Sequence, residues 1–178
     1  PERRVGLMGL GVLGSDAATA LTALRFDVAC WTRTPKEMPG VSGYHSADGL
    51  DAFLARTEIL IALMPLTDNT RGILNASLFA KLPKGAGLIN AGRGGLQIEA
   101  DIIAALDSGQ LSEAVLDVFS TEPLPTDNPL WTHPKVTITP HNAALTGSAT
   151  GAREVAANLK RVLAGAQPHN IVNPNAGY

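Results

Sequence analysis

The sequence is short of cysteine, of aromatic residues and of excess charge. Cys30 is the only cysteine among 178 residues, so the chain has neither a disulfide framework nor a thiol metal site. No apolar run approaches the roughly 18 residues of a membrane span. The net charge is −2, so the chain lacks the excess of basic residues that is typical of nucleic-acid-binding proteins. We therefore expect a cytoplasmic protein that binds neither membranes nor nucleic acid and keeps Cys30 buried as a structural residue.

The chain does contain an alternation of apolar strands and helices. Strands are predicted at 3–8, 26–31, 58–63, 86–90, 114–118 and 136–139. Helices are predicted from the glycine turn to about 24, from Ser46 or Asp48 to 55, from Asn75 to about 82, at 99–107 and at 148–164, with Gly109 at a C′ position. The proline- and glycine-rich stretches 32–44 and 121–134 are predicted to be irregular.

This alternation predicts a doubly wound α/β fold of the Rossmann type, in which helices cover both faces of a parallel sheet. Ligands of such sheets bind at the carboxyl ends of the strands. The residues that stand out chemically each follow a predicted strand, and they are Gly9, Thr32, Pro65, Arg93, Asp117 and His141. The placement predicts one shared site at that edge.

The first strand runs into Gly9-Leu10-Gly11-Val12-Leu13-Gly14, and a helix follows. In a dinucleotide-binding fingerprint, Gly9 allows the tight turn, Gly11 lets the pyrophosphate approach the backbone and Gly14 lets helix and strand pack closely. The amides near Val12 and Leu13, at the positive end of the helix dipole, are expected to bind the phosphates. A glycine turn without a ligand is the alternative.

The end of the second strand predicts which nucleotide binds. NAD enzymes usually place an acid there for the ribose hydroxyls, whereas this chain has Trp31-Thr32-Arg33-Thr34. An arginine flanked by hydroxyls suits a 2′-phosphate through charge-assisted hydrogen bonds. We expect NADPH to be preferred, with NAD possible if Arg33 is only a solvated charge.

The loop after the third predicted strand contains Met64, Pro65, Thr67 and Thr70. Pro65 ends the strand, and the threonine hydroxyls are predicted to lie near the bound phosphates. Thr67 is equally suited to capping a turn.

Three residues of the second half suit the reduction of a 2-keto acid. His141 would supply the proton to the carbonyl oxygen, because an imidazole titrates near working pH. Glu122 would orient that imidazole, and Arg93 would hold the substrate carboxylate and polarise the carbonyl. Each alone has a plain alternative, namely a structural histidine, a turn carboxylate and a loop charge. His45, His133 and His169 are expected to be surface or loop residues, and no cluster has metal-ligand spacing.

Several segments together resemble the D-isomer-specific 2-hydroxyacid dehydrogenases, and most closely their glyoxylate/hydroxypyruvate reductase A branch. They are the glycine loop at 9–14, Cys30 to Thr34, Leu63 to Thr67, Glu99 to Gly109, Leu116 to Pro125, Pro129 to Trp131 and Thr139 to His141. The resemblance implies the family's catalytic roles for Arg93, Glu122 and His141. It also implies that Asp117 contacts the nicotinamide carboxamide, while Ala91, Gly92 and Ala143 line the nicotinamide pocket.

The same resemblance implies a homodimer and a substrate domain that precedes most of this chain. We expect 1–166 to be a dinucleotide-binding domain and 167–178 to be a tail that returns to that substrate domain, so that this chain is an excised or truncated piece. Such a piece would bind cofactor but reduce 2-keto acids slowly, because positioning of the substrate is lost. Two other functions remain open. One is a non-catalytic, corepressor-like NAD(P)-binding module, and the other is a phosphoglycerate or other D-2-hydroxyacid dehydrogenase.

Overall fold

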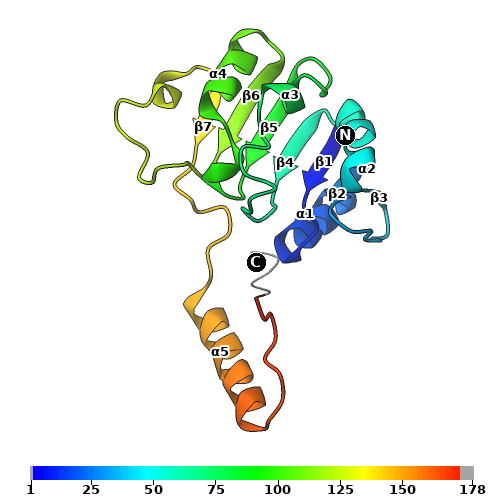
Figure 1. Ribbon diagram of the computed structural model, residues 1–178, viewed down its shortest axis with the longest axis vertical. Helices are drawn as coiled ribbons and strands as arrows, with labels where there is room; N and C mark the ends of the chain where they lie inside the picture. Colours follow the sequence, from blue (N-terminus) through cyan, green and yellow to red (C-terminus); the bar gives the residue numbers. More distant parts are fainter. Residues whose placement is uncertain (1, 173–178) are drawn as a thin grey trace.

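A computed structural model describes residues 2–172 and forms one seven-stranded sheet (Figure 1). All six strand pairs are parallel, in the order β3-β2-β1-β4-β5-β6-β7. The strands are β1 (Arg4–Met8), β2 (Asp27–Thr32), β3 (Val41–His45), β4 (Ile59–Ala62), β5 (Ala86–Asn90), β6 (Leu111–Leu116) and β7 (Val136–Ile138). The order reverses between β1 and β4, which is where such sheets bind ligands. The predicted doubly wound α/β fold is confirmed.

Within residues 2–172 the strands are accompanied by five α-helices and two 3₁₀ turns. They are α1 (Val12–Ala23), α2 (Ser46–Arg56), α3 (Ala76–Phe79), α4 (Glu99–Asp107), α5 (Ser148–Leu163), η1 (Gly94–Leu96) and η2 (Pro129–Thr132). The Asn75 side chain caps α3 by accepting from the Leu78 amide at 3.0 Å. This agrees with the predicted start of the helix at Asn75. Gly109 follows α4 with φ of +73°, which confirms its predicted C′ role.

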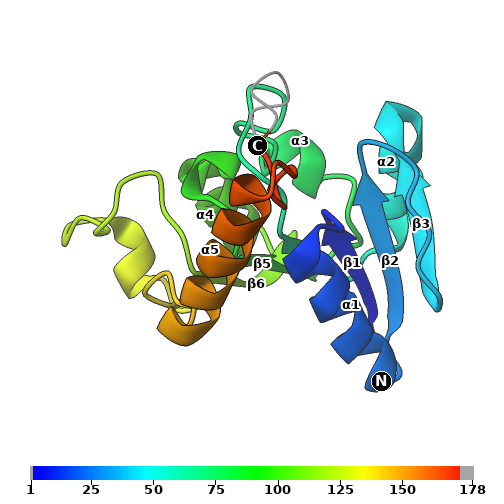
Figure 2. The ribbon, with the colours of Figure 1, turned by 90° about the horizontal axis from the view of Figure 1, so that it is seen from below.

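Two hydrophobic cores lie on opposite faces of the sheet, because neighbouring residues of a strand point to opposite faces. Met8 belongs to the larger core beneath α2, α3 and α4, whereas its neighbour Leu7 belongs to the smaller core beneath α1. Cys30 is 1% exposed in the smaller core, which confirms its predicted burial, and burial raises the pKa of its thiol. Figure 2 shows α1 on the other side of the strands from α3 and α4.

The prediction of a loop throughout 32–44 is wrong, because β3 forms within it. This strand lies at the edge of the sheet and pairs only with β2, with Val41 and Tyr44 half-buried and the other residues exposed. An edge strand needs little apolar sequence, so the surrounding prolines and glycines concealed it. The sixth strand along the sheet also starts earlier than predicted, at Leu111, because Ser112 and Glu113 are polar and exposed.

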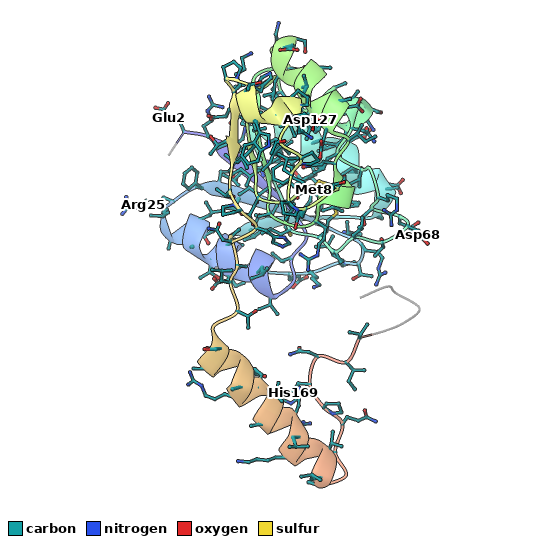
Figure 3. All side chains as sticks on the ribbon, turned by 90° about the vertical axis from the view of Figure 1, so that its left-hand side faces the viewer. Glu2, Met8, Arg25, Asp68, Asp127 and His169 are labelled. Atoms are coloured by element: carbon teal, nitrogen blue, oxygen red, sulfur yellow. The ribbon has the colours of Figure 1, made fainter. Side chains whose placement is uncertain are left out.

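Helix α5 extends away from the sheet, at the end of an extended segment (Figure 1). None of its residues is buried, and large apolar side chains on it are exposed, including Val155 and Leu159. The chain after α5 turns back along the helix, where the His169 amide donates to Asn158 Oδ1 at 2.7 Å. Figure 3 shows His169 beside α5 and Met8 among the densely packed side chains of the sheet. Among the described residues, no helix has both the length and the apolar character that crossing a bilayer requires.

Candidate active site

The glycine turn between β1 and α1 has the geometry expected of a dinucleotide loop. Gly9 has φ of +105°, and its amide donates to the Trp31 carbonyl at 3.0 Å. A Cβ on Gly14 would lie 2.2 Å from the Gly9 carbonyl oxygen, so only glycine permits this packing of helix against strand. A Cβ on Gly11 would meet no atom within 4 Å. The turn therefore needs glycine at 9 and 14 for its own conformation, whereas Gly11 faces open space that a ligand can approach.

Val12 and Leu13, which begin α1, are large apolar residues that are exposed by 84% and 50%. They stand at the positive end of the helix dipole, beside the carboxyl ends of β1 and β4. The predicted phosphate site therefore lies at a helix N-terminus next to the point where the strand order reverses.

The end of β2 has Thr32 and Arg33 where an NAD enzyme usually has an acid. Thr32 is 7% exposed, and its hydroxyl donates to the Thr34 carbonyl at 2.7 Å, so its proton is used within the turn. Arg33 and Thr34 are exposed. The Trp31 indole donates to the Ser46 carbonyl at 2.7 Å, which fixes this strand against the start of α2.

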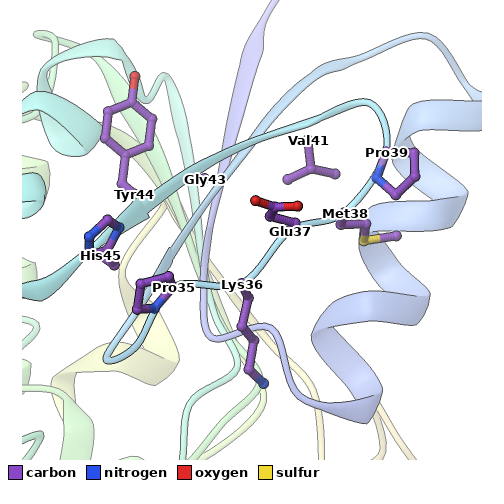
Figure 4. A pocket seen from close by; sticks show the side chains of 9 residues that line it. All are labelled: Pro35, Lys36, Glu37, Met38, Pro39, Val41, Gly43, Tyr44 and His45. Carbon is purple, nitrogen blue, oxygen red and sulfur yellow. The ribbon is translucent and has the colours of Figure 1, made fainter.

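Lys36 is a cation that the sequence analysis did not single out. Its Nζ donates to the Leu10 carbonyl at 2.9 Å and so reaches the glycine turn. It also lines a cavity of about 710 Å³ between the β2–β3 segment and β3, together with Glu37, Tyr44 and His45 (Figure 4). The signal available in the sequence was a second positive charge three residues after Arg33.

The loop after β4 is closed by its own hydroxyls. Thr70 Oγ1 donates to the Pro65 carbonyl at 2.8 Å and accepts from the Thr67 amide at 2.8 Å. The two threonine hydroxyls are 3.1 Å apart. These contacts agree with Thr67 acting in a turn, and Met64 at the start of the loop is buried.

The three residues predicted to be catalytic come together at the carboxyl edge of β5, β6 and β7. His141 Nδ1 lies 2.7 Å from Glu122 Oε2. Arg93 follows β5, and the next residue, Gly94, packs so closely on the chain at Phe119 that a Cβ there would lie 1.9 Å from the Phe119 carbonyl carbon. The Phe119 amide in turn donates to Glu122 Oε1 at 2.9 Å. The loop of Arg93 is therefore packed directly against the loop that carries Glu122.

The pKa of the Glu122 carboxyl is held below its ordinary value. The hydrogen bond from His141 is the largest cause, followed by the one from the Phe119 amide. Burial opposes these, and the charges of His141 and Arg93 lower the pKa further. Glu122 therefore stays ionised at neutral pH and suits the stabilisation of a charged imidazole.

Asp117 holds the turn that carries His141. Its carboxylate accepts from the Asn142 and Ala143 amides, each at 3.0 Å, and from the Thr139 hydroxyl. His141 itself has φ of +52°, a left-handed conformation that is uncommon for a residue with a side chain. Burial raises the pKa of the Asp117 carboxyl, but the Thr139 and backbone hydrogen bonds outweigh it, and the pKa lies below its ordinary value.

The remaining predicted residues of the nicotinamide pocket lie beside these groups. The Ala91 amide donates to the Ala62 carbonyl at 3.2 Å, and Gly92 is buried. His45 lies at the end of β3 and His169 beside α5, both exposed, while the ring of His133 is largely covered and lies 3.4 Å from Asp107. Within residues 2–172, no three His, Cys, Asp or Glu side chains are grouped as metal ligands.

A glycine turn at the reversal point of a parallel sheet, with an acid–base pair at the same edge, is the architecture of a dinucleotide-binding domain of a dehydrogenase. Comparison with known proteins gives the family. A sequence model described as the NAD binding domain of D-isomer specific 2-hydroxyacid dehydrogenases matches residues 1–143. The chain belongs to this family.

Curated and solved relatives agree with this assignment. Over 174 residues the chain is 48% identical to glyoxylate/hydroxypyruvate reductase A of Serratia proteamaculans. The aligned region covers 98% of this chain and 56% of that relative. The chain thus spans about half the length of the curated relatives it matches.

Solved structures are also similar to most of this chain, among them the following two. The first is a D-isomer specific 2-hydroxyacid dehydrogenase from Xanthobacter autotrophicus, in complex with NADPH and MES, with a TM-score of 0.96, 47% identity and coverage of 99% of this chain and 73% of that chain. The second is an NADPH-dependent glyoxylate/hydroxypyruvate reductase from Sinorhizobium meliloti, with NADP and sulfate, at a TM-score of 0.94, 47% identity and coverage of 99% and 57%.

Proposed function

We propose that the protein containing this chain uses NADPH to reduce a small 2-keto acid, glyoxylate or hydroxypyruvate, to the 2-hydroxy acid. The observation that carries the proposal is the 2.7 Å contact between His141 and Glu122, beside Arg93 at the edge where the glycine turn opens. The relatives whose names state this activity support it.

The nucleotide site fits NADPH. Gly11 leaves room for a pyrophosphate beside the first turn of α1, and two cations, Arg33 and Lys36, follow β2 where an NAD enzyme usually has an acid. The Thr32 hydroxyl donates its proton to the Thr34 carbonyl, so that proton is not available to a ligand. We therefore assign the binding of the 2′-phosphate to Arg33, Lys36 and the exposed Thr34. Bound NADPH supplies the hydride.

The chain's own residues supply the proton and bind the substrate. His141 donates its Nε2 proton to the carbonyl oxygen, because Nδ1 is bound to Glu122. Glu122 stabilises the charged imidazole and fixes its orientation. Arg93 binds the substrate carboxylate. Its Nη1 donates to the Gly92 carbonyl at 2.7 Å, and a guanidinium carries further donors for a bidentate contact.

The test is reduction by the purified gene product that contains these residues. Loss of NADPH absorbance is followed with glyoxylate, hydroxypyruvate and 3-phosphohydroxypyruvate, for the wild type and for His141→Gln. We expect reduction of the first two substrates and a loss of about 10²-fold or more in the variant. NADPH binding without turnover would instead support a corepressor-like module, and preference for the phosphorylated substrate would support a phosphoglycerate dehydrogenase, a type with one relative at 32% identity.

We also propose a homodimer in the cytoplasm, with the domain division 1–166 and 167–178 predicted above. Exposed apolar side chains such as Trp131, Leu145 and Val155 offer surface for association. Sedimentation of the gene product at several concentrations tests the dimer, and a constant monomer mass would contradict it.

A further inference from the structure

Two buried amide side chains lie behind the Arg93 loop, and the roles assigned above leave them unused. Asn90 is the last residue of β5 and is 0% exposed, and Gln97 follows η1 and is 4% exposed. Asn90 Nδ2 donates to Gln97 Oε1 at 2.8 Å. Burying two amides among apolar residues is unfavourable unless their hydrogen bonds are made, so the contacts that they make indicate what they do.

Both ends of the Asn90 side chain bind the loop. Its Oδ1 accepts from the Gly92 amide at 3.1 Å, and its Nδ2 also donates to the Arg93 carbonyl at 3.2 Å. A single amide side chain thus holds one backbone group of Gly92 and one of Arg93. Gly92 is also closely packed, since a Cβ there would lie 2.9 Å from Leu96 Cδ1.

Gln97 carries this connection to the neighbouring strand. Its Nε2 donates to the Val118 carbonyl at 3.1 Å. Val118 directly follows Asp117, whose carboxylate holds the turn of His141, and the Asp117 amide donates to the Asn90 carbonyl at 3.0 Å. A continuous series of hydrogen bonds therefore joins the loop of Arg93 to the turn of His141.

We propose that Asn90 and Gln97 are positioning residues that fix the Arg93 guanidinium relative to His141, an inference that rests on the proposed function. Both groups must act on one small substrate at once, on its carboxylate and on its carbonyl oxygen. Arg93 is exposed, and the glycines on either side of it have no side chains that could orient its guanidinium. The buried amide pair adds four directional hydrogen bonds to the packing of this loop.

The main test is Gln97→Met in the gene product that contains this chain. Methionine keeps the length of the side chain but removes both hydrogen bonds of Gln97. We expect kcat/KM for the 2-keto acid to fall by about 10- to 100-fold, because a misplacement near 1 Å costs about that much. Gln110→Met is the matched control. It also removes two hydrogen bonds of a glutamine, those to the Phe79 and Leu82 carbonyls, far from the site, and kcat/KM should stay within about 2-fold.

A double-mutant cycle separates positioning from general destabilisation. If Gln97 acts through Arg93, Gln97→Met should change kcat/KM by less than about 2-fold in an Arg93→Ala background. An equal loss in both backgrounds, or no loss with Arg93 present, would overturn the proposal. Asn90→Asp serves as the second variant, since it keeps the acceptor for the Gly92 amide but loses the donor to Arg93 and Gln97.

Hydrogen exchange tests, independently of turnover, whether Asn90 and Gln97 order the loop of Arg93. Both variants should speed exchange of the peptide covering 91–96 by about tenfold or more and leave peptides of β1 and β2 unchanged. Unchanged exchange at 91–96 would overturn the positioning role even in an active enzyme. A wild type that fails to reduce any 2-keto acid would overturn the proposed function, while the exchange result would still show whether the amide pair orders this loop.

Discussion

His141 Nδ1 and Glu122 Oε2 lie 2.7 Å apart, although the two residues belong to different loops, one after β7 and the other within the irregular stretch after β6. The contact occupies Nδ1 of the imidazole and leaves Nε2 for the proposed proton transfer. It also joins the imidazole to a carboxylate that stays charged at neutral pH, because the pKa of Glu122 lies below its ordinary value.

Glu122→Gln should lower kcat by about 10- to 100-fold, because a neutral amide no longer stabilises the charged imidazole. Initial rates at neutral pH measure this effect. Glu99→Gln is a suitable control, since the Glu99 carboxylate binds Asn128 at 2.9 Å away from the site. An unchanged kcat in Glu122→Gln would contradict the assigned role.

Arg33→Asp should weaken NADPH binding much more than NADH binding, because an acid repels the 2′-phosphate and accepts from ribose hydroxyls. We expect a loss of about 100-fold for NADPH, with NADH changed far less. Calorimetric titration with both nucleotides in matched buffer measures this difference. Arg25→Asp makes the same charge change beyond the far end of α1 and should leave both affinities unaltered. Equal losses of affinity for NADPH and NADH would contradict the assignment of Arg33 to the 2′-phosphate.

Gly14→Ala and Gly11→Ala should separate folding from cofactor binding within one turn. The Gly14 variant should lose about 1–3 kcal/mol of stability, since its Cβ would overlap the Gly9 carbonyl oxygen. The Gly11 variant should keep its stability within about 0.5 kcal/mol but bind NADPH at least about tenfold more weakly, because its methyl group would fill the space left for the pyrophosphate. Urea unfolding and nucleotide titration of each variant measure the two effects. A Gly11 variant that unfolds early while binding normally would contradict this division.

Asp117→Asn should destabilise the protein at neutral pH by about 1–3 kcal/mol, because the Asn142 and Ala143 amides would lose a charged acceptor. The folded-state pKa of Asp117 is lowered, so its stabilising contribution is complete above the unfolded pKa of about 3.9. That contribution disappears as the pH falls through the folded-state value. The difference in unfolding free energy between wild type and variant should therefore narrow below about pH 4. Urea unfolding at pH 7, 5, 4 and 3 measures it, and a difference that stays constant would contradict the assignment.

Much of the fold was predictable because its signals are local. Strand β5 and helix α4 lie where their apolar runs and the glycine at 109 predict them. The glycine turn was equally clear, since a positive φ at Gly9 and close packing at Gly14 can be met only by glycine. Strand β3 was missed because it lies at the sheet edge, where pairing with β2 supplies the stability that its own sequence does not.

The candidate site was predictable only as separate pieces. The motifs pointed to Arg93, Glu122 and His141, but not to the amides of Asn90 and Gln97 or to Lys36. A buried asparagine or glutamine looks like any polar loop residue in a sequence, because its role depends on partners brought near by pairing of the strands. The two members of the amide pair lie seven residues apart, and the Val118 carbonyl lies 21 residues beyond Gln97.

By itself the sequence determined the parallel α/β architecture, the dinucleotide turn and the identity of three residues suited to 2-keto acid reduction. These follow from periodicity, from glycine geometry and from the chemistry of side chains that follow strands. The tertiary structure alone decided that Glu122 meets His141, that Asp117 holds the turn of His141 and that Gln97 donates to the Val118 carbonyl. Those contacts exist because parallel pairing of β5, β6 and β7 brings the carboxyl ends of distant strands to one edge.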